Sequence, residues 1–580
     1  MTNQEIAQTF TLIADLLQIR GDVIYKIIAY RKAADNLLNL GRDVNTIWQE
    51  GGLQGLMDIP GVGKAIAEKI EELLRTGELT FLNKLGEEIP HSLADLMPIP
   101  DLGPKKIKLF WKELDVTTVD ELKAAAEAGK LAALPGMGRK SQDKILAGIE
   151  SLARRQAAGD RTPLEHAFPF AQTQLEMLRA VSGVVRAEAA GSLRRMRETV
   201  GDIDILVAAV DSAPVMDAFT RQPGVARVLG QGTTKASVEF TNGMRAQVWV
   251  HPPEKYGTAL QYATGSKDHN VAMRELALSQ GLSLSEHALT RVDSGAELHF
   301  ATEEAVYQHL GIPWVPPELR EDRGEMDAAR KNALPSRLQT AQIIGSLHNH
   351  STWSDGKATI REMAEAAVAR GYKILAITDH SHGLGITQGV SPDDLLRQRA
   401  EIDAVQAEFG DTLTLLQGVE LEIKADGTLD FDDDVLAALD IVVASLHVSL
   451  RQPRAQVTER ALNAIHNPHV DILGHPTGRI IPDREGADLD MEQILAAAAQ
   501  TNTALEINAN PRRLDLSDIY ARRAVEMGIK ISINTDAHAP DHFDLLHFGV
   551  AVARRGWVEP QHVINCWDAE TLLRWLEQRK

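Results

Sequence analysis

The sequence has almost no cysteine and no long apolar segment, the features typical of proteins in oxidising compartments or membranes. Its one cysteine, Cys566, excludes an intrachain disulfide and any cysteine-rich zinc site. No N-terminal apolar segment resembles a signal peptide, and no stretch is apolar over the length that a bilayer requires. We therefore expect a cytoplasmic protein with no membrane partner. At 580 residues, with 44% hydrophobic and 24% charged residues, the chain should form several globular domains.

Positive charge is also scarce, because the formal net charge is −20. The deficit is uneven: residues 341–580 contain 36 acidic and 22 basic side chains, whereas the first 340 residues contain 45 and 39. A DNA-binding surface needs only local basic patches. The overall acidity therefore does not exclude a nucleic-acid partner.

A glycine-punctuated unit occurs three times in the N-terminal third, at residues 56–64, 96–104 and 131–139. Each unit predicts an apolar helix end, a Pro/Gly turn and a new helix rich in Lys or Arg. The three units resemble the helix-hairpin-helix motif, in which backbone amides at the second helix hold a DNA phosphate without reading sequence. The middle unit departs by carrying Asp101 where the others have glycine. The candidate DNA-binding residues are Gly61, Gly63, Lys64, Gly103, Lys105, Gly136, Gly138 and Arg139.

Two aspartates one residue apart, Asp202 and Asp204, lead into a β-branched apolar run. On a strand they would share one face, with Ile203 and Ile205 turned into the core. Adjacent carboxylates suit a hard cation such as Mg²⁺ or Mn²⁺. Just upstream, residues 191–195 offer backbone amides, a hydroxyl and guanidinium groups to a phosphate. The combination predicts nucleotidyl transfer, against the alternative of a solvated strand end.

These features, together with residues 262–266, resemble a family X DNA polymerase over roughly residues 1–317. The resemblance implies that Asp202 and Asp204 ligate two Mg²⁺ or Mn²⁺ ions and act as catalytic residues. It also implies contacts to a deoxynucleoside triphosphate. The nucleotide-binding candidates are Gly191, Ser192, Arg195, Tyr262, Gly265, Asn270 and Arg274. Ala263 stands where the family usually has an aromatic residue, so we expect relaxed discrimination against ribonucleotides.

Lys69 lies on a predicted helix at residues 64–75 and, with Lys26 and residues 30–32, resembles the lyase pocket of the same family. There a lysine forms a Schiff base with the aldehyde of an abasic sugar. The alternative is an exposed lysine on an amphipathic helix.

The strand after the Asp-x-Asp pair departs from the family pattern. Gln247 stands where a third aspartate would ligate a metal and help to deprotonate the primer hydroxyl, and residues 240–253 contain no Asp or Glu. If Asn242 and Gly243 form a two-residue turn, Gln247 pairs with Val238, and Glu239 faces the other side of the sheet. Loss of such a base should slow synthesis on the order of 10³-fold or more.

The last 240 residues contain a series of short apolar runs that each end in a potential metal ligand. Helical stretches separate these runs, so they predict a parallel α/β barrel with polar residues at its C-terminal rim. The candidate ligands are His348, His350, Asp355, His380, Glu420, His447, His475, Asp536 and His538.

This part, from about residue 342 to 540, resembles the PHP (polymerase and histidinol phosphatase) domain, a distorted barrel with three metals. The resemblance implies one ion on His348, His350, Glu420 and Asp536. It implies a second shared by Glu420 with His447 and His475, and a third on Asp355, His380 and His538. Imidazole and carboxylate ligands suit Zn²⁺ or Mn²⁺, and a metal-activated water would attack phosphorus. His382, Asp379 and Glu506 are candidate supporting residues, and Arg451, Arg479, Arg512 and Arg513 are candidate phosphate contacts.

The expected architecture is therefore multidomain, α and α/β. It comprises a helical lyase-like domain (1–90), helical fingers (91–160), a nucleotidyltransferase palm (161–255), a thumb (256–317), a linker (318–341) and a PHP barrel (342–580). The charged stretch 318–333 of the linker is expected to be a helix outside any core. The expected function is repair of gapped or damaged DNA by a monomer that fills gaps and trims 3′ ends. Two alternatives remain: a 3′-end nuclease with an impaired polymerase half, and a small-molecule phosphatase of the histidinol-phosphate type.

Overall fold

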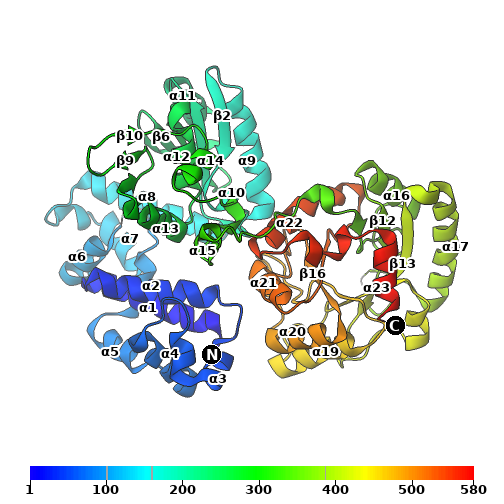
Figure 1. Ribbon diagram of the computed structural model, residues 1–580. Coiled ribbons are helices and arrows are strands. Elements are labelled where there is room, and N and C mark those ends of the chain that lie inside the picture. Colours follow the sequence, from blue (N-terminus) through cyan, green and yellow to red (C-terminus); the bar gives the residue numbers. More distant parts are fainter. Residues whose placement is uncertain (100–101, 159–160, 386, 580) are drawn as a thin grey trace. The chain divides into compact units, whose positions relative to one another are not determined.

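The computed structural model describes residues 1–99, 102–158, 161–385 and 387–579. The chain divides into two compact units, residues 1–160 and residues 161–580 (Figure 1). Within the described ranges, no helix combines the length and the apolarity needed to cross a bilayer.

The first unit is helical, as the sequence predicts. Its first helix buries Ile6, Phe10, Ile13 and Leu17 at helical spacing and begins with a capping box between Thr2 and Glu5. The helices are α1 (Asn3–Arg20), α2 (Ile24–Leu38), α3 (Val44–Met57), α4 (Lys64–Thr76), α5 (Thr80–Glu88), α6 (Pro104–Leu114), α7 (Val119–Glu127) and α8 (Arg139–Ala158), with short 3₁₀ segments η1 (His91–Leu96) and η2 (Leu131–Ala133).

Each of the three predicted hairpins has its second helix, because α4, α6 and α8 begin directly after Gly63, Gly103 and Gly138. Only the first hairpin has a full α-helix before its turn, namely α3. The other two turns follow η1 and η2, so the expected helix end is wrong there. Pro90 and Pro98 leave η1 too few residues for an α-helix. Asp101, the expected departure of the middle unit, lies outside the described residues.

The expected palm is a five-stranded sheet in the order β2-β4-β7-β6-β5. Its strands are β2 (Val184–Ala189), β4 (Ile203–Ala209), β5 (Val225–Gln231), β6 (Lys235–Phe240) and β7 (Arg245–His251). Strands β4 and β7 run parallel, and the other neighbours are antiparallel. One face packs on α9 (Leu164–Arg179) and α11 (Ala213–Arg221) through a buried cluster that includes Ile203, Ile205 and Val248.

The register of the β6–β7 hairpin differs from the expected one. The turn contains three residues, Thr241 to Gly243, because the amide of Phe240 donates to the carbonyl of Met244. Gln247 therefore pairs with Ser237 rather than Val238. A shift of one residue exchanges the two faces of a strand, so Glu239 lies on the same face as Gln247. The expectation that it faces the other side is wrong.

The thumb follows the palm. Its helices are α12 (Tyr256–Thr264), α13 (Lys267–Ser279), α14 (Glu303–His309) and α15 (Glu325–Arg330), beside a small antiparallel sheet of β8 (Leu282–Leu284), β9 (Leu289–Arg291) and β10 (Glu297–Leu298). The segment after residue 317 was expected to be a linker helix rather than part of a core. Instead Met326 and Ala329 of α15 belong to the thumb's hydrophobic cluster, and Arg320 and Glu325 are fully buried. Arg320 pairs with Glu303 at 2.6 Å, and Glu325 accepts hydrogen bonds from His269 and from the amides of Asp322 and Arg323.

The C-terminal part is the predicted parallel barrel. Seven strands follow one another in sequence order, all parallel: β11 (Gly345–Ser346), β12 (Ile374–Ile377), β13 (Thr414–Glu422), β14 (Ile441–Ser445), β15 (Ile472–Leu473), β16 (Ala504–Asn508) and β17 (Ile531–Asn534). A parallel bridge between Asn349 and Ala537 brings the first and last strands together. The surrounding helices (Figure 1) are α16 (Ile360–Ala369), α17 (Pro392–Phe409), α18 (Asp433–Ala437), α19 (Arg454–His466), α20 (Met491–Thr501), α21 (Asp518–Glu526), α22 (Leu546–Arg555) and α23 (Ala569–Glu577).

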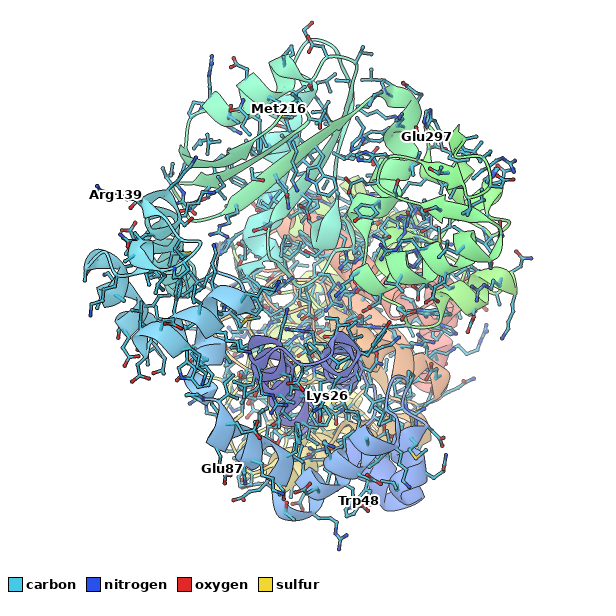
Figure 2. All side chains as sticks on the ribbon, turned by 90° about the vertical axis from the view of Figure 1, so that its left-hand side faces the viewer. Lys26, Trp48, Glu87, Arg139, Met216 and Glu297 are labelled. Atoms are coloured by element: carbon cyan, nitrogen blue, oxygen red, sulfur yellow. The ribbon has the colours of Figure 1, made fainter. Side chains whose placement is uncertain are left out.

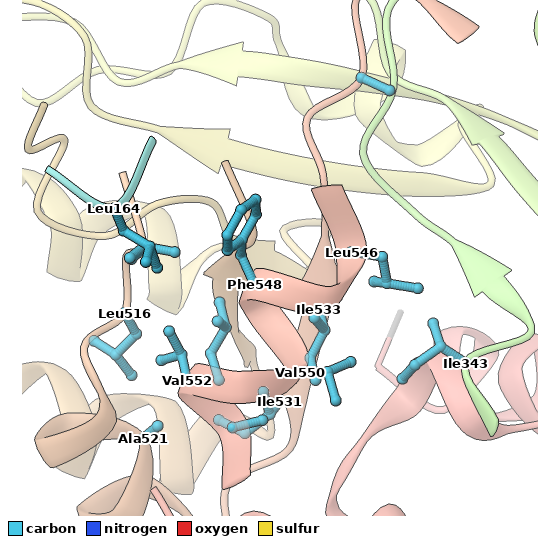
Figure 3. Packing of buried hydrophobic residues seen from close by; sticks show 14 of the residues in the cluster. Leu164, Ile343, Leu516, Ala521, Ile531, Ile533, Leu546, Phe548, Val550 and Val552 are labelled. Atoms are coloured by element: carbon cyan, nitrogen blue, oxygen red, sulfur yellow. The ribbon is translucent and has the colours of Figure 1, made fainter. Parts of the chain in front are cut away.

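The palm and the barrel share one hydrophobic cluster. Leu164 at the start of α9 lies with Leu516, Phe548 and Val552 of the barrel (Figure 3). Phe168 of the same helix packs edge-on against Phe548, with ring centroids 5.2 Å apart. The contact is therefore a packed core and not only a polar surface.

Candidate active sites

The palm's two aspartates stand where the sequence predicts. Asp202 is exposed just before β4, and Asp204 is the second residue of that strand. Burial raises the pKa of Asp204 to about 6, the charge of Asp202 adds to the rise, and a hydrogen bond from Gln247 opposes it. Oδ1 of Asp204 is buried and has no hydrogen-bond partner. A buried carboxylate oxygen without a donor, next to a second carboxylate, is suited to bind a cation.

Gln247 lies beside Asp204 on the parallel neighbouring strand, at the paired position. Its side-chain amide bonds to Asp204, and its Oε1 accepts from Nε1 of Trp249 at 3.3 Å. An amide is a weak cation ligand and takes no proton. The structure therefore places a neutral side chain at the position where the family resemblance requires a third acid.

Glu239 lies on the same face of the sheet as Gln247 in the observed register. It lies opposite Arg245, two residues along from Ser237, the partner of Gln247. Its Oε2 is 3.7 Å from Nε of Arg245 and 3.9 Å from the guanidinium of Arg227. The sequence could not place it, since its face depends on the length of one turn.

Contacts join several of the predicted nucleotide-binding residues of the palm and thumb. Gly191 opens the short helix α10 (Gly191–Arg194), followed by Arg195, whose guanidinium donates to the carbonyl of Thr264 at 2.7 Å and pairs with Glu321 at 3.0 Å. Thr264 directly precedes Gly265, whose left-handed φ of 67° suits glycine. Ser192 is half-buried beside Gly191.

On the thumb side, the amide of Asn270 donates to the carbonyl of Tyr262 at 2.8 Å, joining α13 to the end of α12. Arg274 is exposed on α13. Arg161 is a further candidate phosphate contact that the sequence did not indicate. Its guanidinium donates to the hydroxyl and the carbonyl of Thr199, and it interacts electrostatically with Arg195 and Asp202. Its only signal was its place as the first residue of the predicted palm.

The predicted lyase pocket contains two amines over one aromatic ring. Nζ of Lys26 and of Lys69 lie 4.9 Å and 5.3 Å from the ring centroid of Phe81. Tyr30 is buried and stacks on the same ring. Lys69 also donates to the carbonyl of Ala65 at 3.0 Å. The predicted residues are thus neighbours, and Phe81 is an addition that sequence reasoning missed.

The hairpin turns present open backbone. Gly63, Gly103, Gly136 and Gly138 have no heavy atom near the position of an added Cβ, whereas Gly61 packs closely on Lys32 and Asn36. Four exposed positions can therefore admit a phosphate group to the backbone. The predicted cations of the hairpins, Lys64, Lys105 and Arg139, are all exposed. Figure 2 shows Arg139 on the helical unit, together with Lys26 of the predicted lyase pocket.

All nine predicted ligands of the barrel gather at the C-terminal ends of its strands. Three overlapping groups have ligand atoms within 4.8 Å of one another: His348, His350, Glu420 and Asp536; His350, Asp355, His380 and His538; and His380, Glu420 and His447. Nε2 of His447 and of His475 lie 3.1 Å and 2.8 Å from Oε1 of Glu420. His350 and His380 thus join groups to which the sequence-based grouping did not assign them.

The donor set fits divalent cations. Buried atoms without a hydrogen-bond partner include Nε2 of His348, both ring nitrogens of His350, Oε2 of Glu420 and Oδ1 of Asp536. Burial works to raise the pKa of Glu420, but the charges of His380, His348 and His447 outweigh it and hold that pKa well below the usual value. Unpartnered buried ligand atoms are costly unless a cation satisfies them.

Supporting side chains orient the ligands. Nδ1 of His348 donates to Glu506 at 2.8 Å, and Nδ1 of His447 donates to Glu422 at 2.6 Å. Each bond leaves Nε2 for the cluster. Glu506 was a predicted support, whereas Glu422, which ends β13 two residues after Glu420, was missed. The period-two spacing on that strand was its available signal.

The other predicted supports, Asp379 and His382, contact residues outside the nine ligands. Asp379 accepts from Ser351, Ser354 and Gln398, and so fixes the first loop rather than a ligand. His382 is half exposed beside Asp430.

The four arginines predicted to contact phosphate differ in their surroundings. Nε of Arg513 lies 3.7 Å from Oδ2 of Asp536, and its buried Nη1 has no hydrogen-bond partner. Arg451 is exposed, Arg512 pairs with Asp483, and Arg479 pairs with Glu198 of the palm. Of the four, Arg513 is the one beside the metal-ligand cluster.

Comparisons with known proteins cover the whole chain. Family models match as a helix-hairpin-helix domain at residues 1–79, a SAM-like helix-hairpin-helix tandem at 93–151, a DNA polymerase beta thumb at 259–321 and a PHP domain at 346–510. The chain is 39% identical to the DNA polymerase/3′-5′ exonuclease PolX of Bacillus subtilis over 99% of this chain and 100% of that protein.

Two other relatives match one part each. DNA polymerase lambda of Rattus norvegicus is 27% identical over 55% of this chain and 56% of its own length. A probable phosphatase of Thermoanaerobacter sp. (strain X514) is 32% identical over 41% of this chain and 96% of its own length.

Proposed function

Because the chain belongs to the family X DNA polymerases that end in a PHP domain, we propose that it fills gaps in DNA by nucleotidyl transfer and trims 3′ ends in its barrel. The observation that carries the proposal is the pairing, in one chain, of an Asp-x-Asp strand beside a phosphate-binding turn with a buried cluster of imidazoles and carboxylates. Gapped or damaged DNA and deoxynucleoside triphosphates are its substrates. The monomeric state and the cytoplasmic location remain predictions.

In the palm, Asp202 and Asp204 would hold Mg²⁺ or Mn²⁺, which when bound neutralises the triphosphate and the developing charge. The amides and hydroxyl at Gly191 and Ser192 orient the phosphates, and Arg195 adds a cationic donor after exchanging Glu321 for phosphate oxygens. Asn270 and Gly265 shape the sugar pocket, beside Tyr262 and with Arg274 at its edge. Ala263 leaves room for a 2′-hydroxyl, so comparison of deoxynucleotide and ribonucleotide incorporation tests the relaxed discrimination.

In the barrel, up to three Zn²⁺ or Mn²⁺ ions on the nine ligands would supply Lewis acidity at the scissile phosphodiester. Glu506 and Glu422 hold His348 and His447 in the tautomers that turn Nε2 toward the cluster. Arg513 offers an unpartnered guanidinium nitrogen to a phosphate oxygen. These residues bind and orient the 3′-terminal phosphodiester for hydrolysis.

An exonuclease assay on 3′-labelled single-stranded DNA tests the barrel's role. A His348→Ala/His350→Ala variant should lose activity by at least about 10²-fold, because ligand loss removes the ions. The control is His466→Ala, an exposed histidine on α19 outside the cluster. Unchanged degradation by the double variant would remove the barrel from the proposal.

Lys69 would act as the lyase nucleophile and Lys26 as a second cation at the abasic sugar. Borohydride trapping on gapped DNA with a 5′ abasic sugar tests this role. Lys69→Ala should abolish the covalent adduct, and Lys123→Ala, at an exposed position on α7, should keep it. Equal trapping by the Lys69 variant would contradict the assignment.

A second function is favoured by Gln247: a 3′-end nuclease whose polymerase half only grips DNA. Under it, synthesis is negligible in wild type and appears in Gln247→Asp. If wild type already extends primers, another group must replace the missing base, and Glu239 is the carboxylate on the same face. Loss of extension in Glu239→Gln, with Glu188→Gln unchanged, would assign that role.

A further inference from the structure

Side chains of the barrel hold a loop of the palm. The loop runs from Arg195 to Glu198, between α10 and β3 (Thr199–Val200). Two nitrogens of Arg479 contact the two carboxylate oxygens of Glu198, at 2.7 Å and 3.3 Å. Arg555 of α22 donates to the carbonyl of Met196, which has a left-handed φ of 53°. Two residues far away in the sequence thus fix consecutive parts of this loop.

The same loop carries the triphosphate contact. Arg195 is its first residue, and the amide of Arg197 donates to the carbonyl of Ser192 at 3.0 Å. The loop's backbone is therefore tied to both residues that are expected to hold phosphate oxygens. Displacement of Glu198 would therefore shift the backbone of the loop, and with it the Cα atom from which the Arg195 side chain extends.

We call the Arg479–Glu198 pair the clamp. On the barrel side, backbone contacts hold its arginine in place. Besides Glu198, the guanidinium of Arg479 donates to the carbonyls of Arg513 and Leu514. An exposed ion pair between two free side chains contributes little, since both must be ordered. Here Arg479 is ordered in advance by two backbone acceptors, and a two-nitrogen contact fixes direction as well as distance.

We propose that Arg479 of the barrel and Glu198 of the palm are positioning residues for nucleotide binding, which they affect by holding the loop that places Arg195. The inference rests on the proposed function of Arg195 as a triphosphate contact. It makes the PHP domain a structural part of the polymerase site, in addition to its own hydrolytic role.

Equilibrium binding of dATP with Mn²⁺ to the full chain tests the clamp without requiring turnover. Glu198→Gln removes the ion pair and leaves the bonds of Arg479 to the barrel in place. It should weaken dATP affinity about tenfold, in the range of coupling between linked sites, and leave 3′ exonuclease activity at the wild-type level. Arg479→Met should weaken it similarly, and the double variant should be no weaker than either single variant.

Two comparisons separate the possible failures. Asp217→Asn removes an exposed palm ion pair with Arg221, which is outside the loop, and should bind dATP as wild type does. Arg195→Met tests the premise. If Arg195→Met loses affinity while Glu198→Gln does not, or if Glu198→Gln lowers only the melting temperature, the positioning role is wrong. If Arg195→Met binds as tightly as wild type, the assignment of Arg195 is wrong, and the clamp fails with it.

Discussion

At the scale of single residues, the palm depends on a close approach between Gly191 and Asp204. Gly191 has a left-handed φ of 58°, and a Cβ there would overlap Oδ2 of Asp204. The glycine therefore allows the turn that we propose to bind phosphate to approach the strand that carries Asp202 and Asp204. The amide of Ala190 also donates to the carbonyl of Asp204 at 2.8 Å, so the two segments are tied together.

Gly191→Ala should displace the Asp204 carboxylate and lower affinity for dATP with Mn²⁺ by up to about 10²-fold, since small misplacements at a reacting centre are costly. The matched control is Gly183→Ala, also at a left-handed φ but with open space around the added Cβ. Both variants bear the backbone strain, and only the first has the overlap. Equal affinities in titration calorimetry would contradict the account of Gly191.

What the sequence could predict at this scale followed from local spacing. Asp202 and Asp204 were readable because alternation on a strand needs no partner. The face of Glu239 was not, because it depends on whether a turn has two residues or three. The Arg479–Glu198 pair joins positions 281 residues apart, and no local pattern indicates it.

At the scale of elements, the joint between palm and thumb is a buried ion network. Glu303 at the start of α14 pairs with Arg320 at 2.6 Å and with Arg194 of α10 at 2.7 Å. Burial works to raise the pKa of Glu303, but the two arginines outweigh it and lower that pKa to about 2. This network is why the segment after residue 317 is part of a core, although its charges resemble those of a linker.

The lowered pKa of Glu303 predicts acid-sensitive stability. Its stabilising effect is fully present above its unfolded pKa near 4.5 and is lost as pH falls toward 2. The linked change in the free energy of unfolding is about 3 kcal/mol. Urea unfolding at successive pH values should show that the difference between wild type and Glu303→Gln shrinks across this window. Glu304→Gln, an exposed neighbour, should leave the pH slope unchanged, and a constant difference for Glu303→Gln would contradict the pairing.

Helices and strands were predictable where their periodicity is strong. The parallel barrel and the helices that begin after Gly63 and Gly103 were predicted, and six of the seven barrel strands lead into one or more of the nine candidate ligands. The 3₁₀ segments η1 and η2 were not anticipated, since apolar spacing does not distinguish a short 3₁₀ turn from a helix end.

At the scale of the whole molecule, palm, thumb and barrel form one compact unit, in which the palm and the barrel share a hydrophobic cluster. The barrel's buried ligands have unpartnered atoms, so bound ions should stabilise this unit. Removing the ions with a chelator should lower its melting temperature, because a ligand at 100 times its Kd stabilises by about 3 kcal/mol. The His348→Ala/His350→Ala variant should show little further change with chelator. A large chelator effect in that variant would place the stabilising ions elsewhere.

The central claim is that one chain holds a working palm and a working barrel despite Gln247. Extension of a labelled primer on gapped DNA with Mn²⁺ and deoxynucleotides, in wild type, Asp202→Ala, Gln247→Asp and His348→Ala/His350→Ala, tests it most directly. We predict weak extension by wild type, loss in Asp202→Ala, a rise in Gln247→Asp and retention in the histidine variant. No extension by any variant, with only 3′ degradation that disappears in the histidine variant, would contradict a working palm.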